Sequence, residues 1–507
     1  MPQTGTLSQK IKDLQQFFLN YIEKEKLPGV TVAVRQGGEL VWEQAFGARD
    51  DRGTPMTADT IFGIASMSKG VTCAALAALE AEGRASFMDP AAQYIPGLRV
   101  KNMPPESLLL HHLATHSSGV PPLPLLAWSL TFHTPEPDAS PERVETLDKR
   151  RQEATSKVAT LQDIVDYFRG GDYQPLGLPG MYNSYSNDSF ALLSAAVDKA
   201  AGKPLEDVLS EKIFGPLGMT RSILDADAAE AAKLGTLTEL FNKKSEGGFT
   251  SDTAWDVAPP YRGAGWIKST ARDMAKFYEA LCYGGKVGGR EVLPGADTLY
   301  GAKFPEMPYD TSYCYGLMKH PFRAGGKDYW IVEHAGGLHG VATKGGFVKG
   351  SDGISAAVLC NWEDAPISPL LAAVFSVMLG YPPDSSYYFW PEPDGAPGEP
   401  GVYVGRYHQD ERFADDAVVE LRDGQLVSVC ESGVKRLLFC GTTKFAAEEP
   451  GKIRDRWDLY QFFMDEGGAA KRLRIGSRIY TRVGTPSVAA ATSPPRGAMR
   501  AVGYVTR

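Results

Sequence analysis

The chain has 507 residues, which is too many for one ordinary hydrophobic core and enough for about two to four structural units. Hydrophobic residues make up 43% of the sequence and charged residues 22%, a composition that is typical of a globular protein and excludes a largely disordered one. The net charge is -8 and no long run of Lys or Arg occurs, so the composition argues against nucleic acid as a partner.

Residues 1–26 carry apolar side chains at helical spacing between charged ones, which predicts an amphipathic helix and not a secretory signal peptide. No run of about 18 or more apolar residues occurs, so we predict no membrane span and no membrane partner. The 6 Cys residues are scattered and form no Cys-x-x-Cys pair. Together these features predict reduced thiols in a cytoplasmic protein.

Predicted strands lie at both ends of the first part of the chain, with predicted helices between them. Residues 30–34 and 40–46 have the pattern of a hairpin, and residues 345–348 and 354–361 the pattern of two adjacent strands. Helices are predicted over 67–83, 161–168, 189–201, 270–283 and 368–379. This order predicts an α/β (α+β) class of fold, in which helices flank a mainly antiparallel sheet that carries a helical insert.

A second unit is predicted after a stretch rich in Pro and Gly. We assign residues 1–381 to the first unit and residues 382–400 to a linker. Short apolar segments separated by turns then predict a small antiparallel β-barrel over 401–484. These segments are 402–407, 417–422, 425–430, 437–439, 459–464 and 472–475. Residues 485–507 are predicted to be an extended tail.

Ser66 and Lys69 begin a predicted helix with the spacing Ser-x-x-Lys, which places both side chains on one helical face. A serine hydroxyl is a weak nucleophile until a neighbouring base takes its proton. A neighbouring ammonium, a helix N-terminus and partial desolvation all favour deprotonated states nearby. Ser-x-x-Lys is also common by chance, with Ser66 as a helix cap and Lys69 as a solvated charge.

Two further motifs supply groups that suit acyl transfer. Tyr185 and Asn187 form a Tyr-x-Asn motif, in which a phenol can relay a proton and an amide can orient a substrate. The alternative is a polar turn whose Asn187 or Asp188 caps the next helix. His334, Gly336 and Gly337 form a glycine-rich segment whose backbone can approach a ligand closely. The N–H groups of Gly337 and Ser66 are the predicted oxyanion hole, and the alternative is a turn with a surface His.

The three motifs occur in the order that β-lactamases and penicillin-binding proteins share. The chain resembles this superfamily of serine hydrolases, in particular its class C β-lactamase, D-aminopeptidase and esterase branch. The resemblance runs from about residue 27 to residue 379. It rests on the segments Phe62–Lys69, His111–Gly119, Phe214–Met219 and Ser269–Asp273 together with the three motifs. The C-terminal barrel resembles the lipocalin-like extra domain that some members carry, which can shape or block the cleft.

The resemblance implies an acyl-enzyme mechanism without a cofactor. It implies Ser66 as nucleophile, Lys69 as its paired lysine, a partly anionic Tyr185 as general base and Asn187 as the substrate-orienting amide. His334 stands where β-lactamases carry Lys, and this departure removes a permanent cation for a substrate carboxylate. It therefore favours the esterase and aminopeptidase relatives, and Gly336 and Gly337 complete the predicted substrate-binding set.

Other residues invite a second reading. His112 and His116 are four residues apart, but no third ligand is identifiable, so we predict no metal. Four tryptophans suit either an aromatic acyl pocket or the core, and we expect core positions. They are Trp128, Trp255, Trp266 and Trp330. The charged stretch 141–157 is predicted to be a solvated insertion.

These observations predict an enzyme that cleaves a small-molecule ester or amide. The alternatives are a D-stereospecific aminopeptidase or amidase that takes short D-amino-acid peptides, a true β-lactamase, and an acyltransferase. A non-catalytic penicillin-binding-like protein is the alternative from another class, and the presence of Ser66, Lys69 and Tyr185 argues against it. Oligomeric state is not predicted.

Overall fold

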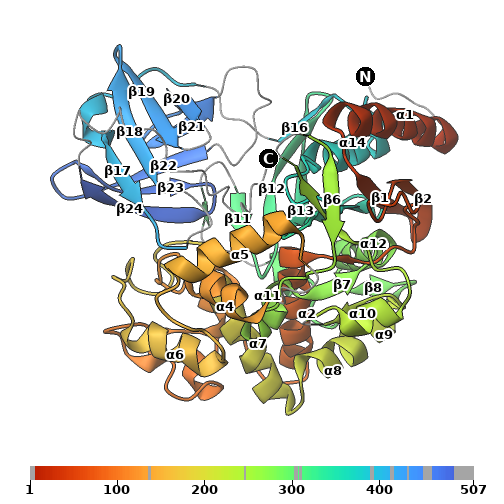
Figure 1. The fold of residues 1–507 in the computed structure, drawn as a ribbon, viewed down its shortest axis with the longest axis horizontal. Coiled ribbons are helices and arrows are strands. Elements are labelled where there is room, and N and C mark those ends of the chain that lie inside the picture. Colours follow the sequence, from red (N-terminus) through yellow and green to blue (C-terminus); the bar gives the residue numbers. More distant parts are fainter. Residues whose placement is uncertain are drawn as a thin grey trace.

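The structure is a computed structural model that describes residues 6–134, 139–225, 227–244, 247–301, 306–307, 311–388, 393–411, 416–430, 433–448 and 459–484. Within these ranges the chain forms a nine-stranded sheet with flanking helices and, near the C-terminus, a closed eight-stranded barrel (Figure 1). The predicted class of fold and the predicted barrel are therefore confirmed. The predicted tail, 485–507, lies outside the described residues.

The large sheet is assembled from both ends of the first unit. β1 (Gly29–Gln36) pairs antiparallel with β2 (Glu39–Gly47) on one side and with β15 (Ser355–Cys360) on the other. The order continues through β14 (Val341–Val348) and β13 (Lys327–Leu338). The strands β12 (Met318–Ala324), β11 (Thr311–Tyr313) and β10 (Glu306–Met307) end this order, and the ninth strand, β16 (Ser386–Tyr388), pairs with β12. All residues of β14 and β15 are buried, as expected for strands that are covered on both faces.

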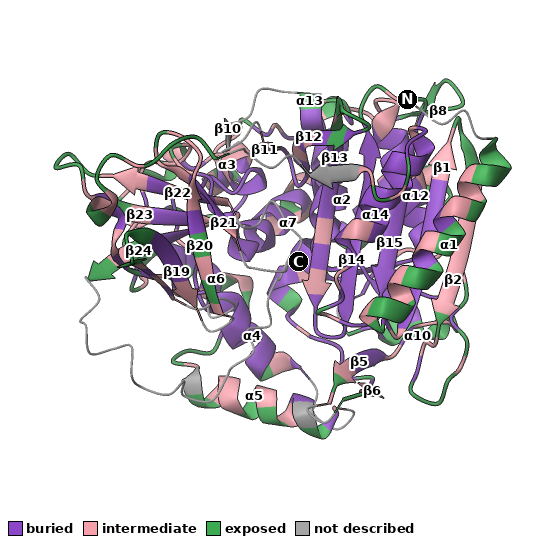
Figure 2. Cartoon of the chain, turned by 90° about the horizontal axis from the view of Figure 1, so that it is seen from above, coloured by how far each residue is buried: buried purple, intermediate pink, exposed green. Residues whose placement is uncertain are grey.

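Helices cover both faces of this sheet. α1 (Leu7–Glu25) buries Leu14 and Phe18 in a core that it shares with α14 (Ser368–Met378), while its outer side is exposed (Figure 2). On the other face, α2 (Ser68–Ala81) and α12 (Ala271–Cys282) belong to a second and larger core. The buried side of each helix follows its apolar residues, because burial of apolar surface is the main stabilising contribution.

The helical insert follows α2 in the chain. Its helices and those that follow are α3 (Leu110–Ala114), α4 (Leu125–His133), α5 (Pro141–Glu153), α6 (Leu161–Gly170), α7 (Asn187–Ala201), α8 (Leu205–Leu209), α9 (Gly215–Leu217), α10 (Ala229–Lys233), α11 (Arg262–Gly265) and α13 (Thr298–Gly301). One small sheet consists of the three short strands β3 (Phe62–Gly63), β7 (Ile267–Ser269) and β4 (Ile223–Leu224). Two pairs of short strands form further small sheets: β5 (Leu240–Lys243) with β6 (Phe249–Asp252), and β8 (Lys286–Val287) with β9 (Arg290–Glu291). The helices predicted from the sequence are present within a few residues of their predicted bounds.

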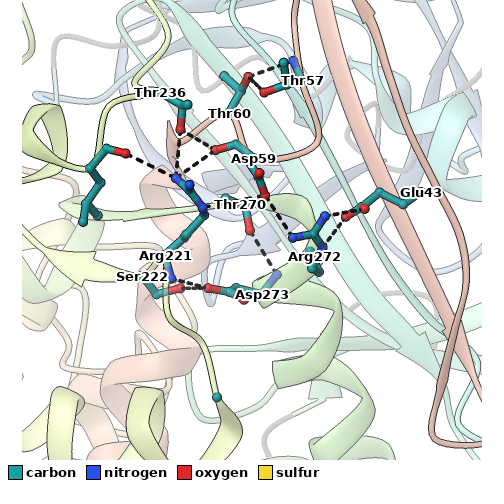
Figure 3. Close-up of polar contacts among 12 residues, drawn as sticks. Glu43, Thr57, Asp59, Thr60, Arg221, Ser222, Thr236, Thr270, Arg272 and Asp273 are labelled. Atoms are coloured by element: carbon teal, nitrogen blue, oxygen red, sulfur yellow. Dashed lines mark hydrogen bonds and ion pairs between the residues drawn. The ribbon is translucent and has the colours of Figure 1, made fainter.

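The segment Ser269–Asp273, which carries part of the family resemblance, has a scaffolding role (Figure 3). Thr270 caps α12 by accepting a hydrogen bond from the backbone N–H of Asp273 at 3.2 Å. Arg272 donates to both carboxylate oxygens of Glu43 on β2, at 2.6 and 2.5 Å, and to Asp59 at 2.9 Å. This network joins α12 to β2 and to the loop that precedes β3, and β3 leads directly into the segment that holds Ser66.

The barrel consists of β17 (Gly405–His408), β18 (Ala417–Arg422), β19 (Gln425–Cys430), β20 (Gly433–Phe439), β21 (Lys444–Glu448), β22 (Leu459–Met464), β23 (Ala470–Ile475) and β24 (Arg478–Gly484). Its core contains Tyr407, Phe445 and Phe462, all nearly inaccessible to solvent. The sequence analysis missed β21 and β24, and the first part of its first predicted strand is a 3₁₀ helix, Pro400–Tyr403. Only closure of the barrel pairs β24 with β17.

The structure differs from the sequence predictions at two other places. The segment predicted to be a linker contributes a short strand, β16 (Ser386–Tyr388), which pairs with β12. Trp128, Trp255 and Trp266 are buried as predicted, but Trp330 is 41% exposed.

The 6 Cys residues all lie within the described ranges. None of them forms a disulfide, and Cys73, Cys314 and Cys360 are buried.

The charged insertion is docked on the body of the protein and is not simply solvated. Arg143, at the start of α5, forms an ion pair with Asp256, and each side chain is only 2% exposed. The preceding Ser140 caps the helix, and its N–H donates to Asp252 at 3.1 Å. Burial alone would raise the pKa of Asp256, but Arg143 and His339 lower it overall, so the carboxylate stays charged.

We expect Arg143→Met to destabilise the protein by about 3–5 kcal/mol, because it leaves the carboxylate of Asp256 buried without its cation. Denaturant unfolding followed by tryptophan fluorescence measures this change, since Trp266 donates to the backbone carbonyl of Asp256 at 2.8 Å. Arg169→Met is the matched control, because Arg169 pairs with Asp166 on the exposed surface of α6. Equal loss of stability in the two variants would contradict the docking role of Arg143.

Candidate active site

Ser66 lies in a strained turn between a strand and a helix. It is the middle residue of a 3₁₀ helix, Ala65–Met67, that follows β3 and leads into α2. Ala65 has a φ of 47°, a left-handed conformation that costs free energy for a residue with a side chain and is often found at functional sites. Met67, and not Ser66, occupies the N-cap position of α2. The alternative interpretation of Ser66 as a helix cap is therefore wrong.

Lys69 is fully buried and makes three short contacts through Nζ. It lies 3.0 Å from Oγ of Ser66, 2.9 Å from Oδ1 of Asn187 and 2.7 Å from the carbonyl oxygen of Ala264 in α11. The alternative of a solvated surface lysine is wrong. Burial is the main cause that holds the pKa of Lys69 well below its usual value, and the neighbouring Arg478 lowers it further.

These three contacts make Lys69 the partner of Ser66. Nζ donates to Oδ1 of Asn187 and to the carbonyl of Ala264, which can only accept hydrogen bonds. The third contact joins Nζ to the hydroxyl of Ser66, with Nζ as the donor. Because burial lowers the pKa of Lys69, an amine that has lost its proton can present its lone pair at this third position and accept the proton of Ser66.

Tyr185 and Asn187 approach the same point from the segment that begins α7. The hydroxyl of Tyr185 is hydrogen-bonded to Ser66. Its ring centroid lies 5.0 Å from Nζ of Lys69. Burial is the main influence on the pKa of Tyr185 and raises it, and the hydrogen bond from Ser66 only partly opposes this effect. The predicted partly anionic Tyr185 is thus disfavoured in the free protein, where the buried side chain is a phenol. Ser186, and not Asn187 or Asp188, caps α7.

The glycine-rich segment is part of β13 and lies against the Ser66 turn. A Cβ atom on Gly336 would lie 2.3 Å from the carbonyl oxygen of Ile64, so only glycine allows this close approach. Gly337, the next residue, pairs with Ala342 of β14. The structure thus brings both glycines to the turn that carries Ser66, and their binding roles stay predictions.

His334 is buried and both of its ring nitrogens have partners. Its Nδ1 lies 2.5 Å from the carbonyl oxygen of Ala335, and its Nε2 lies 2.9 Å from the hydroxyl of Tyr313. A carbonyl can only accept, so Nδ1 carries a proton. The surface His of the alternative interpretation is not what the structure has, because the side chain is buried.

The sequence analysis considered His116 only as a metal ligand, and the structure places it behind Tyr185. The residue lies beyond the end of α3 with a φ of 54°, so it does not share a helical face with His112. Its Nδ1 accepts from the N–H of Ser186 at 3.0 Å, and its ring centroid is 4.1 Å from that of Tyr185. Burial and the nearby Lys69 lower the pKa of His116, so the imidazole is neutral. His116 belongs to the segment His111–Gly119, which carries part of the family resemblance, but nothing in that segment predicts the contact between His116 and Tyr185.

Glu411 and Arg478 of the barrel also reach this site and were missed entirely. The two side chains form an ion pair and are 4% and 12% exposed. The guanidinium carbon of Arg478 lies 5.1 Å from the ring centroid of Tyr185, and Nδ2 of Asn187 donates to Glu411 at 3.4 Å. No local pattern marks these residues, because their proximity to Ser66 arises only from the packing of the two units.

Comparison with known proteins identifies the family to which this fold and site belong. A model of the family described as Beta-lactamase matches residues 9–373. The chain therefore belongs to the β-lactamase family, which is a family of serine hydrolases. Among the described residues, none of the helices combines the length and apolar character needed to span a membrane.

The individual proteins that this chain resembles include enzymes of different kinds, and their sequence identity to the chain is low. The chain is 32% identical over 255 residues to a D-aminopeptidase of Brucella anthropi, covering 50% of this chain and 41% of the relative. It is 26% identical over 264 residues to a β-lactamase of Escherichia coli (strain K12), covering 51% of this chain and 58% of the relative. Each match thus spans less than two thirds of the relative's length. The crystal structure of SurE shares the fold with a TM-score of 0.68 at 19% identity, covering 94% of this chain and 100% of SurE.

We expect Lys69→Met to slow the acylation of Ser66 by about 10²–10⁴-fold, the usual contribution of a positioned general base. The rate of reaction with an ester reporter, measured by stopped flow, checks this expectation. Because the pKa of Lys69 is lowered, the wild-type rate should rise with pH and level off well below the ordinary pKa of lysine. A rate that keeps rising up to the ordinary lysine range would show instead that Lys69 is charged in the native protein.

Proposed function

We propose that this protein is a serine hydrolase that cleaves a small-molecule ester or amide through an acyl-enzyme on Ser66. The observation that carries the proposal is the position of Lys69. Its Nζ donates to two pure acceptors, the amide oxygen of Asn187 and the carbonyl of Ala264, and lies 3.0 Å from Oγ of Ser66. A buried serine that is paired in this way with a buried amine is an activated nucleophile.

Acylation begins when Oγ of Ser66 attacks the substrate carbonyl and its proton passes to Nζ of Lys69. The carbonyl oxygen becomes an oxyanion, for which the N–H groups of Ser66 and Gly337 are the proposed donors. When the tetrahedral intermediate collapses, the leaving alkoxide or amine takes up a proton. The phenol of Tyr185 beside Ser66 is the proposed donor, and the proton on Lys69 replaces the one it gives.

Deacylation uses the same groups in reverse. Lys69, again neutral, takes a proton from a water molecule that attacks the acyl carbonyl, and Oγ of Ser66 leaves with a proton. Asn187 keeps Lys69 oriented throughout, through the 2.9 Å bond to its Oδ1. The mechanism uses only side chains and backbone of this chain, and water as co-substrate.

His334 favours substrates without a carboxylate next to the scissile bond. A β-lactamase substrate brings such a carboxylate, and an imidazole lacks the permanent positive charge with which a lysine would attract it. A D-stereospecific aminopeptidase or amidase is the second candidate. It is favoured by the 32% identity to the D-aminopeptidase of Brucella anthropi. Short D-amino-acid peptides are therefore the peptide substrates that we would assay first.

The test is intact-protein mass spectrometry of wild type and Ser66→Ala after exposure to a fluorophosphonate, p-nitrophenyl acetate or penicillin. We expect the fluorophosphonate and the ester to add mass to the wild type only, and penicillin to react far more slowly. Ser66→Ala should fold normally and lose turnover, because the residue is small and its hydroxyl caps no helix.

Each reagent separates one alternative. Rapid acylation by penicillin would favour a true β-lactamase over the esterase. Formation of an amide or ester product when an added amine or alcohol replaces water would favour an acyltransferase. The absence of any adduct on wild-type protein would refute the proposal and support a non-catalytic binding protein.

A further inference from the structure

The barrel contacts the catalytic segment through the turn between β23 and β24. The N–H of Tyr185 donates to the carbonyl of Ser477 at 2.8 Å, and the N–H of Ile479 donates to Oγ of Ser184 at 3.3 Å. Arg474 on β23 adds a bond to the carbonyl of Asn183 at 2.9 Å. Three hydrogen bonds therefore join the barrel to the residues that precede α7. Figure 1 shows the barrel lying against the helical part of the first unit.

This turn delivers an ion pair to the centre of the active site. Arg478, the first residue of β24, pairs through two nitrogens with Glu411, which follows β17. Its guanidinium faces the ring of Tyr185, and the carboxylate faces the amide of Asn187. A buried ion pair is costly to place, and replacing one with apolar residues is often neutral or stabilising. Its position against two predicted site residues therefore requires an explanation other than stability.

We propose that Glu411 and Arg478 are positioning residues of the active site, with Glu411 fixing the orientation of the Asn187 amide and Arg478 placing a positive charge against the ring of Tyr185. The inference rests on the proposed function, because it concerns how Ser66 is activated. It assigns the barrel a part in the chemical step, in addition to any effect on access to the cleft.

The role of Glu411 follows from the donors and acceptors of Asn187. A carboxylate can only accept, so the side of the amide that faces Glu411 must be the NH₂ group. The amide oxygen must then point to Nζ of Lys69, where it is found at 2.9 Å. If the amide were rotated by half a turn, its NH₂ group would face Lys69 and remove one of the two acceptors on which the neutral amine depends.

The role of Arg478 follows from charge in a buried site. A guanidinium remains protonated in proteins, so a second cation nearby is disfavoured where water is excluded. After the larger effect of burial, Arg478 lowers the pKa of Lys69 and Glu411 raises it. Arg478 likewise lowers the pKa of Tyr185 and Glu411 raises it, again with smaller effects than burial. The two residues therefore have opposite effects on the pKa values of Lys69 and Tyr185, and each effect can be measured by substituting one residue of the pair.

Other titratable groups face the same point from the neighbouring elements. They are Cys73 on α2, His116 after α3, Asp188 on α7, Tyr261 before α11, Tyr313 on β11 and His334 on β13. Asp188 matters most among them, because burial raises its pKa to about 7 and Glu411 adds to that effect. Removal of Glu411 would therefore lower the pKa of Asp188 as well as that of Lys69, and removal of Arg478 would also raise the pKa of His116. The same substitutions made in Lys69→Met, which lacks the amine, separate these contributions from that of Lys69.

The experiment is to measure the rate of Ser66 acylation by p-nitrophenyl acetate against pH in four variants of the full-length protein: Arg478→Gln, Glu411→Gln, the double variant and Arg478→Lys. We expect the acidic limb of the profile to move to higher pH by about one to two units in Arg478→Gln, the usual effect of a nearby charge. It should move to lower pH in Glu411→Gln. The double variant should return toward the wild-type position, and Arg478→Lys, which keeps the charge, should stay close to it.

Arg436→Gln is the matched control, because Arg436 pairs with Glu448 on the exposed surface of the barrel and should leave the profile unchanged. Melting temperatures identify a variant that fails to fold. If a single variant fails to fold, the double variant and Arg478→Lys carry the test through the rate on the plateau of the profile, since neither leaves an unpaired charge. The double variant should acylate more slowly than the wild type, because the amide of Asn187 has lost the carboxylate that orients it, and Arg478→Lys should not. Shifts of both single variants in the same direction would overturn the proposal, as would wild-type rates and profiles in all four variants. Absence of acylation in the wild type would instead refute the proposed function itself.

Discussion

A buried lysine is the group on which the rest of this active site depends. An amine without access to water must either lose its proton or obtain a compensating negative charge. Here the contacts to Asn187 and Ala264 accept its two N–H groups and leave the third position to Ser66. The turn that holds Ser66, the start of α7 and the short helix α11 converge on that one nitrogen, and each has to be in place for the serine to be activated.

The strained turn at Ala65 and the absence of a side chain at Gly336 can be understood from the same constraint. Ser66 must project toward Lys69 while its backbone stays close to β13, and a left-handed residue before the nucleophile makes this possible. The network around Arg272 and Asp273 then holds β2, β3 and α12 together, so that the strain is supported by rigid elements (Figure 3).

The sequence predicted those parts of the molecule whose signal is local. The spacing of Ser66 and Lys69, the apolar strands and the capped helices follow from neighbouring residues, and they are present in the structure. The strand β24 was missed because Arg478, Thr481 and Arg482 interrupt its apolar pattern, and only pairing with β17 and β23 makes it a strand. Glu411 and Arg478 were missed for a related reason, since a charged residue on a barrel gives no sign of which surface it will face. Tyr185 was correctly located, but its protonation state depends on burial, which spacing does not reveal.

The pairing of β1 with β15 has a consequence for how this chain folds. Val30 and Cys360 are register partners, yet nearly the whole first unit separates them along the chain. Until β15 is available, β1 presents one unpaired and strongly apolar edge, which is the kind of surface on which strands of different molecules associate. Because contacts between distant residues form slowly, this edge stays open for a large part of the folding reaction. Recombinant yield should therefore depend more on chaperones and temperature during synthesis than on the stability of the finished protein.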